Sequence, residues 1–313
     1  MRAFIGRFGT ALAGALLLIF FLVFARNFSD SANLLNIAKD ASFLAILSIA
    51  FMLALRVAEL DLSIADVASL CAVVAGALIH QQASPLTAVA AALGVGLAFG
   101  LFNGFGVTVL KVPSLIVTLG TAAIAKGLGF ALTQGVSFTG RWPAAFTGIA
   151  RGSTFGASNL LWVFAGVAIL AWWLLHWTKT GAHMIATGEA EDAARLSGID
   201  TGRAKRLGLA LAGALAGLTA VLLAANVSSA APNMAGDYFL YLVAAVLLGM
   251  TMFEPGKPNI AGTVFAAVVL KALGNGLVLM GAAYYVQDVL LGIIIIASVA
   301  FSASVLRRAA FKV

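Results

Sequence analysis

The polar residues that could do chemistry in this sequence lie inside or beside long apolar stretches. Lys271 falls near the middle of one such stretch, and a lysine at the centre of a membrane helix costs about 2.5–3.5 kcal/mol on insertion scales. Such a lysine faces a wet cavity, where it favours a hydroxyl-rich or anionic solute. Alternatively, it snorkels or pairs with a carboxylate such as Asp288.

Two further groups of polar residues are candidates for contact with a solute. Asp61 and Ser63 stand at a break between two apolar stretches, where they can line a solute path or cap the next helix. Asn103 and Asn275 lie within apolar stretches, where an amide bonds a neighbouring helix or contacts a solute. The candidates for a translocation path are therefore Asp61, Ser63, Asn103, Lys271 and Asn275.

Enzyme and metal chemistry find little support in the residue pattern. Cys71 is the single cysteine, which excludes an intrachain disulfide and a multi-cysteine metal site. The three histidines lie far apart in the sequence, so a zinc site is not expected. Gly256–Lys257 is followed by Pro258, unlike the G-x-x-x-x-G-K-[ST] loop that binds phosphate. We expect no catalytic residue, no metal and no bound cofactor on this chain.

The composition explains why the polar residues stand out. The chain has 313 residues, of which 62% are hydrophobic and 10% charged, with a mean hydropathy of +1.05. A soluble domain carries about 25% charged residues, so this chain lacks the charged surface of a soluble protein. The net charge of +7 is therefore read as lysine and arginine held at the cytoplasmic side of a membrane, with no nucleic-acid partner.

The apolar stretches predict about ten membrane-spanning helices, since each span needs about 20 apolar residues. The breaks between them carry turn or polar residues, as at Ser84–Pro85 and Val112–Pro113. The expected spans are 8–25, 38–55, 64–80, 86–109, 114–133, 159–177, 207–225, 237–252, 260–281 and 284–304.

The positions of the basic residues predict the orientation, with both termini in the cytoplasm. In this topology the outer side holds Arg26, Lys39, Arg141 and Arg151, while Lys126 and Lys271 fall within spans. Basic residues concentrate on the cytoplasmic side of membrane proteins. The cytoplasmic side here holds the other thirteen of the 19 basic residues: Arg2, Arg7, Arg56, Lys111, Lys179, Arg195, Arg203, Lys205, Arg206, Lys257, Arg307, Arg308 and Lys312.

A weak internal repeat relates the two halves of the sequence. Asn103–Gly104 is followed by Gly120, and Asn275–Gly276 is followed by Gly292 at the same spacing. The offset maps the fourth and fifth spans onto the ninth and tenth, so the halves would have opposite orientations. Such inverted repeats are common in transporters, although Asn-Gly pairs also recur by chance in a glycine-rich chain.

Small residues recur along two of the expected spans. Small side chains allow helices to approach closely in a membrane, so we interpret these residues as packing positions. They are Gly94, Gly96, Gly100, Gly104 and Gly106 on one span and Gly208, Ala212, Ala216 and Ala220 on the other.

The longest polar stretch, 178–206, is predicted to be a cytoplasmic loop that contains a short helix over 189–197. Thr187 or Gly188 could cap its start, Glu189, Glu191 and Asp192 suit its first turn, and Gly198 suits the position after its end. Its small face consists of Ala190, Ala193, Ala194 and Ser197, with acids and Arg195 around it. Without bulky apolar residues the helix is a poor membrane anchor. It is either a docking surface for another protein or a solvated connector.

This loop resembles the coupling-helix segment of the ribose-type permease family of ABC importers. The family pattern is roughly Gly-Gly-Asn-x-x-Ala-Ala-Arg-x-Ser-Gly-Ile. Glu189 and Ala190 depart from it. The matching residues are Gly188, Ala193, Ala194, Arg195, Ser197, Gly198 and Ile199.

Other stretches resemble the same family in the same order along residues 30–300. Asp61–Leu62–Ser63 is similar to its Gly-Gly-Ile-Asp-Leu-Ser-Val-Gly motif, although Ala58, Glu59 and Ala65 replace flanking glycines. Met250 and Glu254–Pro255 depart from glycines of a later block. The remaining matches are Asn33–Leu34–Leu35, Asn103–Gly104, Val112–Pro113, Val117–Thr118–Leu119–Gly120, Ala244–Ala245–Val246, Gly249, Thr251, Gly262–Thr263 and Asn275–Gly276.

The resemblance implies an all-α membrane protein with the ten-span fold of cobalamin-importer permeases and a single permease domain over 1–313. It also implies a bacterial inner-membrane importer of a sugar or sugar-like small polar solute. Two permease subunits, identical or different, would pair on two ATPase subunits that bind ATP and magnesium. A periplasmic binding protein would deliver the solute, and the helix at 189–197 would contact the ATPase.

Two other classes of function compete with this interpretation. A stand-alone secondary transporter would share the spans and the repeat, but it usually carries an acidic or histidine relay within the membrane. Only Glu59, Asp61, Asp66 and Asp288 come near such a relay. A membrane-embedded enzyme would need a nucleophile–base pair or a metal-ligand cluster, and the sequence offers neither.

Overall fold

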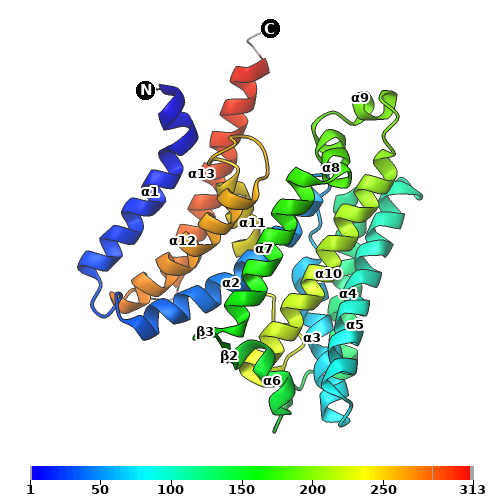
Figure 1. Ribbon diagram of the computed structural model, residues 1–313, viewed down its shortest axis with the longest axis vertical. Helices are drawn as coiled ribbons and strands as arrows, with labels where there is room; N and C mark the ends of the chain where they lie inside the picture. Colours follow the sequence, from blue (N-terminus) through cyan, green and yellow to red (C-terminus); the bar gives the residue numbers. More distant parts are fainter. Residues whose placement is uncertain (1, 284, 311–313) are drawn as a thin grey trace. The chain divides into compact units, whose positions relative to one another are not determined.

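The computed structural model describes residues 2–283 and 285–310, which form thirteen helices and four two-residue strands (Figure 1). Six helices are long and apolar enough to cross a membrane: α2 (Ser31–Leu55), α4 (Pro85–Thr108), α5 (Ser114–Thr133), α7 (Asn159–Trp177), α10 (Thr201–Val227) and α12 (Ile260–Leu279). Four others contain shorter apolar stretches: α1 (Arg2–Phe24), α3 (Ile64–His80), α11 (Tyr238–Gly249) and α13 (Tyr285–Ala310).

Each of the ten apolar segments expected from the sequence contains a helix. Helix α11 ends three residues before the expected end of 237–252, and α2 begins seven residues before the expected start of 38–55. The expected bounds of α3, α5 and α7 agree with the observed ones, because polar or proline-containing breaks flank these segments. At α4 the Ser84 hydroxyl accepts a hydrogen bond from the Thr87 N–H at 3.1 Å, and Pro85 occupies the first turn, where proline needs no hydrogen-bond acceptor. At α12 the Asn259 side chain accepts from the Gly262 N–H at 2.7 Å.

Three short helices and four strands lie outside the expected segments. The stretch after α5 holds β1 (Phe138–Thr139), α6 (Ala144–Arg151), β2 (Ser153–Thr154) and β3 (Ala157–Ser158), and β4 (Ser229–Ala230) follows α10. The stretch expected as a loop with one helix holds α8 (Lys179–Glu189) and α9 (Glu191–Leu196). Helix α10 begins six residues earlier than expected, because the Asp200 side chain accepts from the Arg203 N–H and caps it.

The chain divides into two compact units. Unit 1 comprises residues 1–52 and 240–313, and unit 2 comprises residues 53–239. In unit 2, α4 and α10 lie against each other with their backbones in close contact. A Cβ atom on Gly96 would overlap the carbonyl oxygen of Gly213, and one on Gly213 would overlap that of Gly96. Both helices therefore need glycine there, which confirms the packing interpretation for Gly96. Gly213 was not among the predicted packing positions. The interpretation is wrong for Gly94, where a Cβ atom would meet open space.

The loops that connect the helices of unit 2 lie at two opposite ends of the unit. At one end Lys205 of α10 bonds Glu59 before α3, and the Arg206 guanidinium donates to Thr108 at the end of α4. At the other end β1 pairs with β4 in an antiparallel ladder, and the Arg151 side chain donates to the carbonyl of Asn226. Figure 1 shows α9 at the first end of this unit and α6 at the second.

In unit 1, α1 lies against α12. The ring of Phe21 occupies the space beside Gly276, where a Cβ atom would clash with it. Phe21 also stacks on Phe28 with ring centroids 5.5 Å apart. Together with Ala25, Ile37 and Ala272 these two rings form a buried apolar cluster. The two units do not coincide with the halves of the expected internal repeat.

Candidate functional site

The candidate coupling helix is shorter than the sequence predicted. Helix α8 continues to Glu189, and α9 begins at Glu191, so Thr187 and Gly188 lie inside α8. The expected cap at Thr187 or Gly188 is therefore wrong: the Thr187 hydroxyl donates to the carbonyl of His183. Ala190 precedes α9 and makes no side-chain cap hydrogen bond. Gly188 packs so closely on the carbonyl of Arg56 that a Cβ atom would not fit, which holds α8 against the turn after α2.

The end of α9 follows the expectation. Gly198 has φ +82°, a conformation that glycine adopts without a steric cost. The N–H of Gly198 donates to the carbonyl of Arg195, and the N–H of Ile199 donates to that of Ala194, both at 3.0 Å. These bonds satisfy two carbonyls at the helix end. Glu191 and Asp192 occupy the first turn, where their charges favour the helix dipole.

The exposed surface of α9 differs in part from the predicted small face. Ala190, Ala193 and Ser197 are exposed, whereas Ala194 is buried. The side chain of Leu196, which the sequence analysis did not single out, is 91% exposed. The expectation that the helix lacks a bulky apolar residue is therefore wrong. The sequence signal for this exposed anchor was a leucine between Arg195 and Ser197 in an otherwise polar loop.

A cluster of charges holds α9 to the rest of unit 2. The Lys205 ammonium lies 2.7 Å from a carboxylate oxygen of Glu191 and 2.8 Å from one of Glu59. Glu191 also accepts from Arg195 at 2.9 Å and from Thr201 at 3.3 Å. The hydrogen bond from Lys205 is the main reason that the pKa of Glu191 is lowered. Sequence analysis did not predict this cluster, because its members come from three separate segments.

The Glu59 side of this cluster continues into a buried polar network, to which Leu60 contributes only its backbone. The Leu60 N–H donates to the Ser114 hydroxyl, and the Thr118 hydroxyl donates to the Leu60 carbonyl, both at 3.2 Å. The turn before α3 is therefore bonded to the first turns of α5 as well as to Lys205. Because Lys205 also holds Glu191, a chain of polar contacts runs from α9 to α5.

Three of the expected path residues meet at the centre of this network. The amide nitrogen of Asn103 donates to the Ser63 hydroxyl at 3.0 Å and to Asp61 at 3.4 Å. The Thr121 hydroxyl donates to the Asn103 side-chain oxygen at 2.7 Å. All four side chains are buried. In this conformation they bond one another and tie α3, α4 and α5 together.

The expected helix cap at Asp61 or Ser63 is wrong. Ser63 precedes α3 but makes no side-chain cap hydrogen bond. Asp61 instead accepts from the backbone N–H of Ser63 at 3.0 Å and from its hydroxyl at 2.5 Å. The carboxylate stabilises the turn itself, so the beginning of α3 depends on the network and not on a cap.

The other two expected path residues lie on α12 in unit 1. The Lys271 ammonium is 4.8 Å from the centre of the Tyr241 ring, and its charge interacts with Asp40 on α2. Pairing with Asp288 stays a prediction. Asn275 exchanges two hydrogen bonds with Asn33, at 2.9 and 3.0 Å. Asn275 thus forms the hydrogen bond between helices that we expected from an amide side chain within an apolar stretch.

Comparisons with known proteins identify the family of the chain. The family model described as "Branched-chain amino acid transport system / permease component" matches residues 33–299. The ribose import permease RbsC of Escherichia coli K12 is 34% identical over 87% of this chain and 86% of its own length. The L-arabinose permease AraH of the same strain is 28% identical, over 94% and 90%.

Two further relatives extend the comparison. The autoinducer 2 permease LsrC of Yersinia pseudotuberculosis is 28% identical over 94% of this chain and 84% of its own length. A solved inward-facing structure of a metal-chelate type ABC transporter superposes with a TM-score of 0.54, covering 97% of this chain and 99% of that one at 15% identity. This second likeness shows the fold alone. The chain is a multi-pass membrane protein, and it belongs to the family of branched-chain amino acid transport system permease components.

Proposed function

We propose that this chain is the permease subunit of an ATP-driven importer in the bacterial inner membrane, and that its solute is a sugar or a sugar-like small polar molecule. The names of the ribose, arabinose and autoinducer 2 permeases support this solute class. The family match over most of the chain supports the transport role. ATP and magnesium would bind a separate ATPase subunit, since this sequence carries no phosphate-binding loop.

We further propose ten membrane spans in a single permease domain, with both termini in the cytoplasm. The six long apolar helices and the four shorter ones supply the ten segments. The arrangement of unit 2 supports the alternation of sides, because connections expected inside meet at one end and those expected outside meet at the other. An inverted repeat of five plus five spans fits this count.

In this proposal the cytoplasmic stretch 178–206 presents α9 to the ATPase. The observation that carries it is the combination of one projecting leucine with a small exposed surface on a helix that is bonded into the membrane domain. Leu196 offers an apolar anchor, and Ala193 and Ser197 let a partner approach closely. Lys205 and Glu59 then transmit a displacement of Glu191 to the turn before α3.

The complete importer would contain two ATPase subunits, a second permease that is identical or different, and a periplasmic binding protein. The buried network of Asp61, Ser63 and Asn103 would rearrange during transport, and Lys271 with Asn275 would contribute to the solute path. Replacing Lys271 by leucine tests the path role. A loss of uptake is expected, and unchanged uptake would remove Lys271 from the path.

Copurification tests the central assembly. The chain, solubilised in mild detergent after co-expression with its cognate ATPase, is expected to retain that ATPase, and Leu196→Asp is expected to release it. The alternative, a stand-alone secondary transporter powered by an ion gradient, predicts no stable ATPase complex for either protein.

A further inference from the structure

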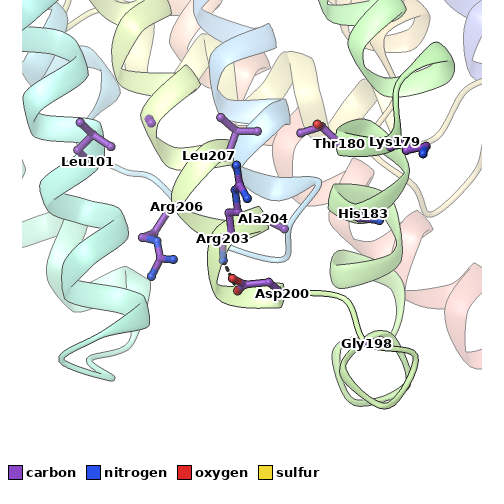
Figure 2. Close-up of a pocket in the computed structure, with 11 residues that line it drawn as sticks. Leu101, Lys179, Thr180, His183, Gly198, Asp200, Arg203, Ala204, Arg206 and Leu207 are labelled. Atoms are coloured by element: carbon purple, nitrogen blue, oxygen red, sulfur yellow. Dashed lines mark hydrogen bonds between the residues drawn. The ribbon is translucent and has the colours of Figure 1, made fainter.

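A cavity opens in unit 2 between the basic ends of its helices. Its volume is about 730 Å³, and residues of α4, α8 and α10 line it together with Gly198 and Asp200. Figure 2 shows these residues arranged around the space beside α10. The coupling helix α9 lies next to the cavity, but its exposed Leu196 is not part of the lining. The cavity therefore shares Gly198 with the coupling segment but excludes the proposed apolar anchor.

Three cationic side chains line the cavity. They belong to Lys179, Arg203 and Arg206, and the lining includes one carboxylate, that of Asp200. An oxygen of that carboxylate already accepts from the Arg203 backbone N–H at 2.8 Å, as the cap of α10. Within the described part of the chain, the three cations take part in none of the salt bridges. The charges therefore favour an anionic ligand, and arginine suits the paired oxygens of a phosphate.

Apolar side chains also line the cavity. They belong to Leu101 of α4 and to Leu207 and Ala210 of α10. Ala210 lies seven residues beyond Arg203, which corresponds to about 10 Å along a helix. The apolar lining therefore extends inward along two helices that are long and apolar enough to cross a membrane. A free inorganic anion has no apolar surface to bury against these side chains.

The Arg203 side chain lies beside the apolar lining. In Figure 2 Arg203 extends from its backbone bond with Asp200 toward Leu207, while Arg206 points toward α4. The Arg206 guanidinium donates to Thr108 at 3.4 Å, which leaves Arg203 as the arginine that faces the space beside α8. A guanidinium at the boundary of a membrane helix lies at the depth of lipid headgroups.

We propose that this cavity binds an anionic phospholipid, with its phosphate against Arg203, Lys179 adding positive charge to the lining, and the start of an acyl chain against Leu101 and Leu207. Basic pockets between membrane helices are known to hold anionic headgroups. The proposal rests on the proposed function only in placing α10 across the membrane. The bound lipid would join α8 to α10 beside the segment that carries α9.

Native mass spectrometry of the purified chain tests the site. The protein is titrated in mild detergent with phosphatidylglycerol or phosphatidylcholine of the same acyl chains. We expect phosphatidylglycerol to bind about tenfold more tightly, and Lys179→Gln/Arg203→Gln to lose that preference, because each basic residue contributes to headgroup attraction. Lys179→Arg/Arg203→Lys is expected to retain it. Lys111→Gln/Arg141→Gln changes the charge equally at exposed residues outside this cavity and is expected to bind phosphatidylglycerol as the wild type does.

Several results would overturn the proposal. Equal binding of the two lipids would show that the cavity has no anionic preference, and an equal loss in the two double variants would show diffuse attraction only. Displacement of phosphatidylglycerol by millimolar inorganic phosphate would assign the site to a free anion. Because lipid binding is measured without transport, a result that refutes the lipid site leaves the importer proposal unaffected.

Discussion

Lys205 of α10 lies 2.8 Å from Glu59, in the turn before α3, and the two side chains are largely buried, at 15% and 9% exposure. The same ammonium lies 2.7 Å from Glu191 on α9. One lysine therefore balances two carboxylates from different segments. If it were removed, Glu59 would lose this counter-charge and Glu191 would keep only that of Arg195. This relationship makes Lys205 the residue on which the attachment of α9 depends.

Lys205→Met is expected to uncouple the importer. Breaking a buried ion pair costs about 3–5 kcal/mol, and we expect about 2 kcal/mol here because Glu191 is partly exposed. Thermal unfolding in detergent measures this loss. Solute transported per ATP hydrolysed should fall while hydrolysis continues. Lys111→Met, at the same end of unit 2, serves as the control. An unchanged transport ratio in Lys205→Met would mean that the cluster only stabilises the fold.

Leu196→Ala is expected to weaken the ATPase complex without affecting the fold. A side chain that is 91% exposed contributes within about 0.5 kcal/mol to stability, whereas an apolar anchor at an interface contributes more than about 1 kcal/mol. The affinity for the ATPase should therefore fall about fivefold or more. Leu86→Ala changes another highly exposed leucine, 77% exposed at the start of α4, and should bind as the wild type does. Equal affinities for all three proteins would place the interface elsewhere.

The stabilisation from Glu191 should disappear in acid. The hydrogen bond from Lys205 lowers its pKa below the ordinary value of 4.5, so the folded state favours the ionised form. This contribution is fully present above the pKa of the unfolded chain and is lost as the pH falls through the lowered folded pKa. Glu191→Gln should therefore unfold at a lower temperature than the wild type at pH 7, and the difference should shrink below about pH 4. A difference that stays constant from pH 7 to pH 3 would contradict the ion-pair assignment.

Gly213→Ala should strongly destabilise unit 2. The added methyl group would overlap the carbonyl oxygen of Gly96 on α4, and overpacking of this kind costs about 1–3 kcal/mol. Gly166→Ala on α7 is the matched control, because its Cβ atom would meet open space and alanine favours a helix over glycine. Unfolding temperatures in detergent compare the two. Equal effects would mean that the α4–α10 contact is looser than described.

The sequence predicted the apolar helices well and the site only in part. Long apolar stretches with polar or proline breaks determine where α3, α5 and α7 begin and end, since these are local properties. The bonds of Lys205 to Glu59 and Glu191 depend on tertiary packing, so no local spacing could indicate them. The division at Glu189–Glu191 was also missed, because the tight contact of Gly188 with Arg56 comes from another segment.

The most direct test of the account is solute uptake by proteoliposomes that contain the chain with its cognate ATPase and binding protein. We expect uptake that requires ATP inside the compartment holding the ATPase and that persists when ionophores collapse every ion gradient. Uptake that continues without ATP and stops when an ion gradient is collapsed would contradict it, and it would assign the chain to secondary transport.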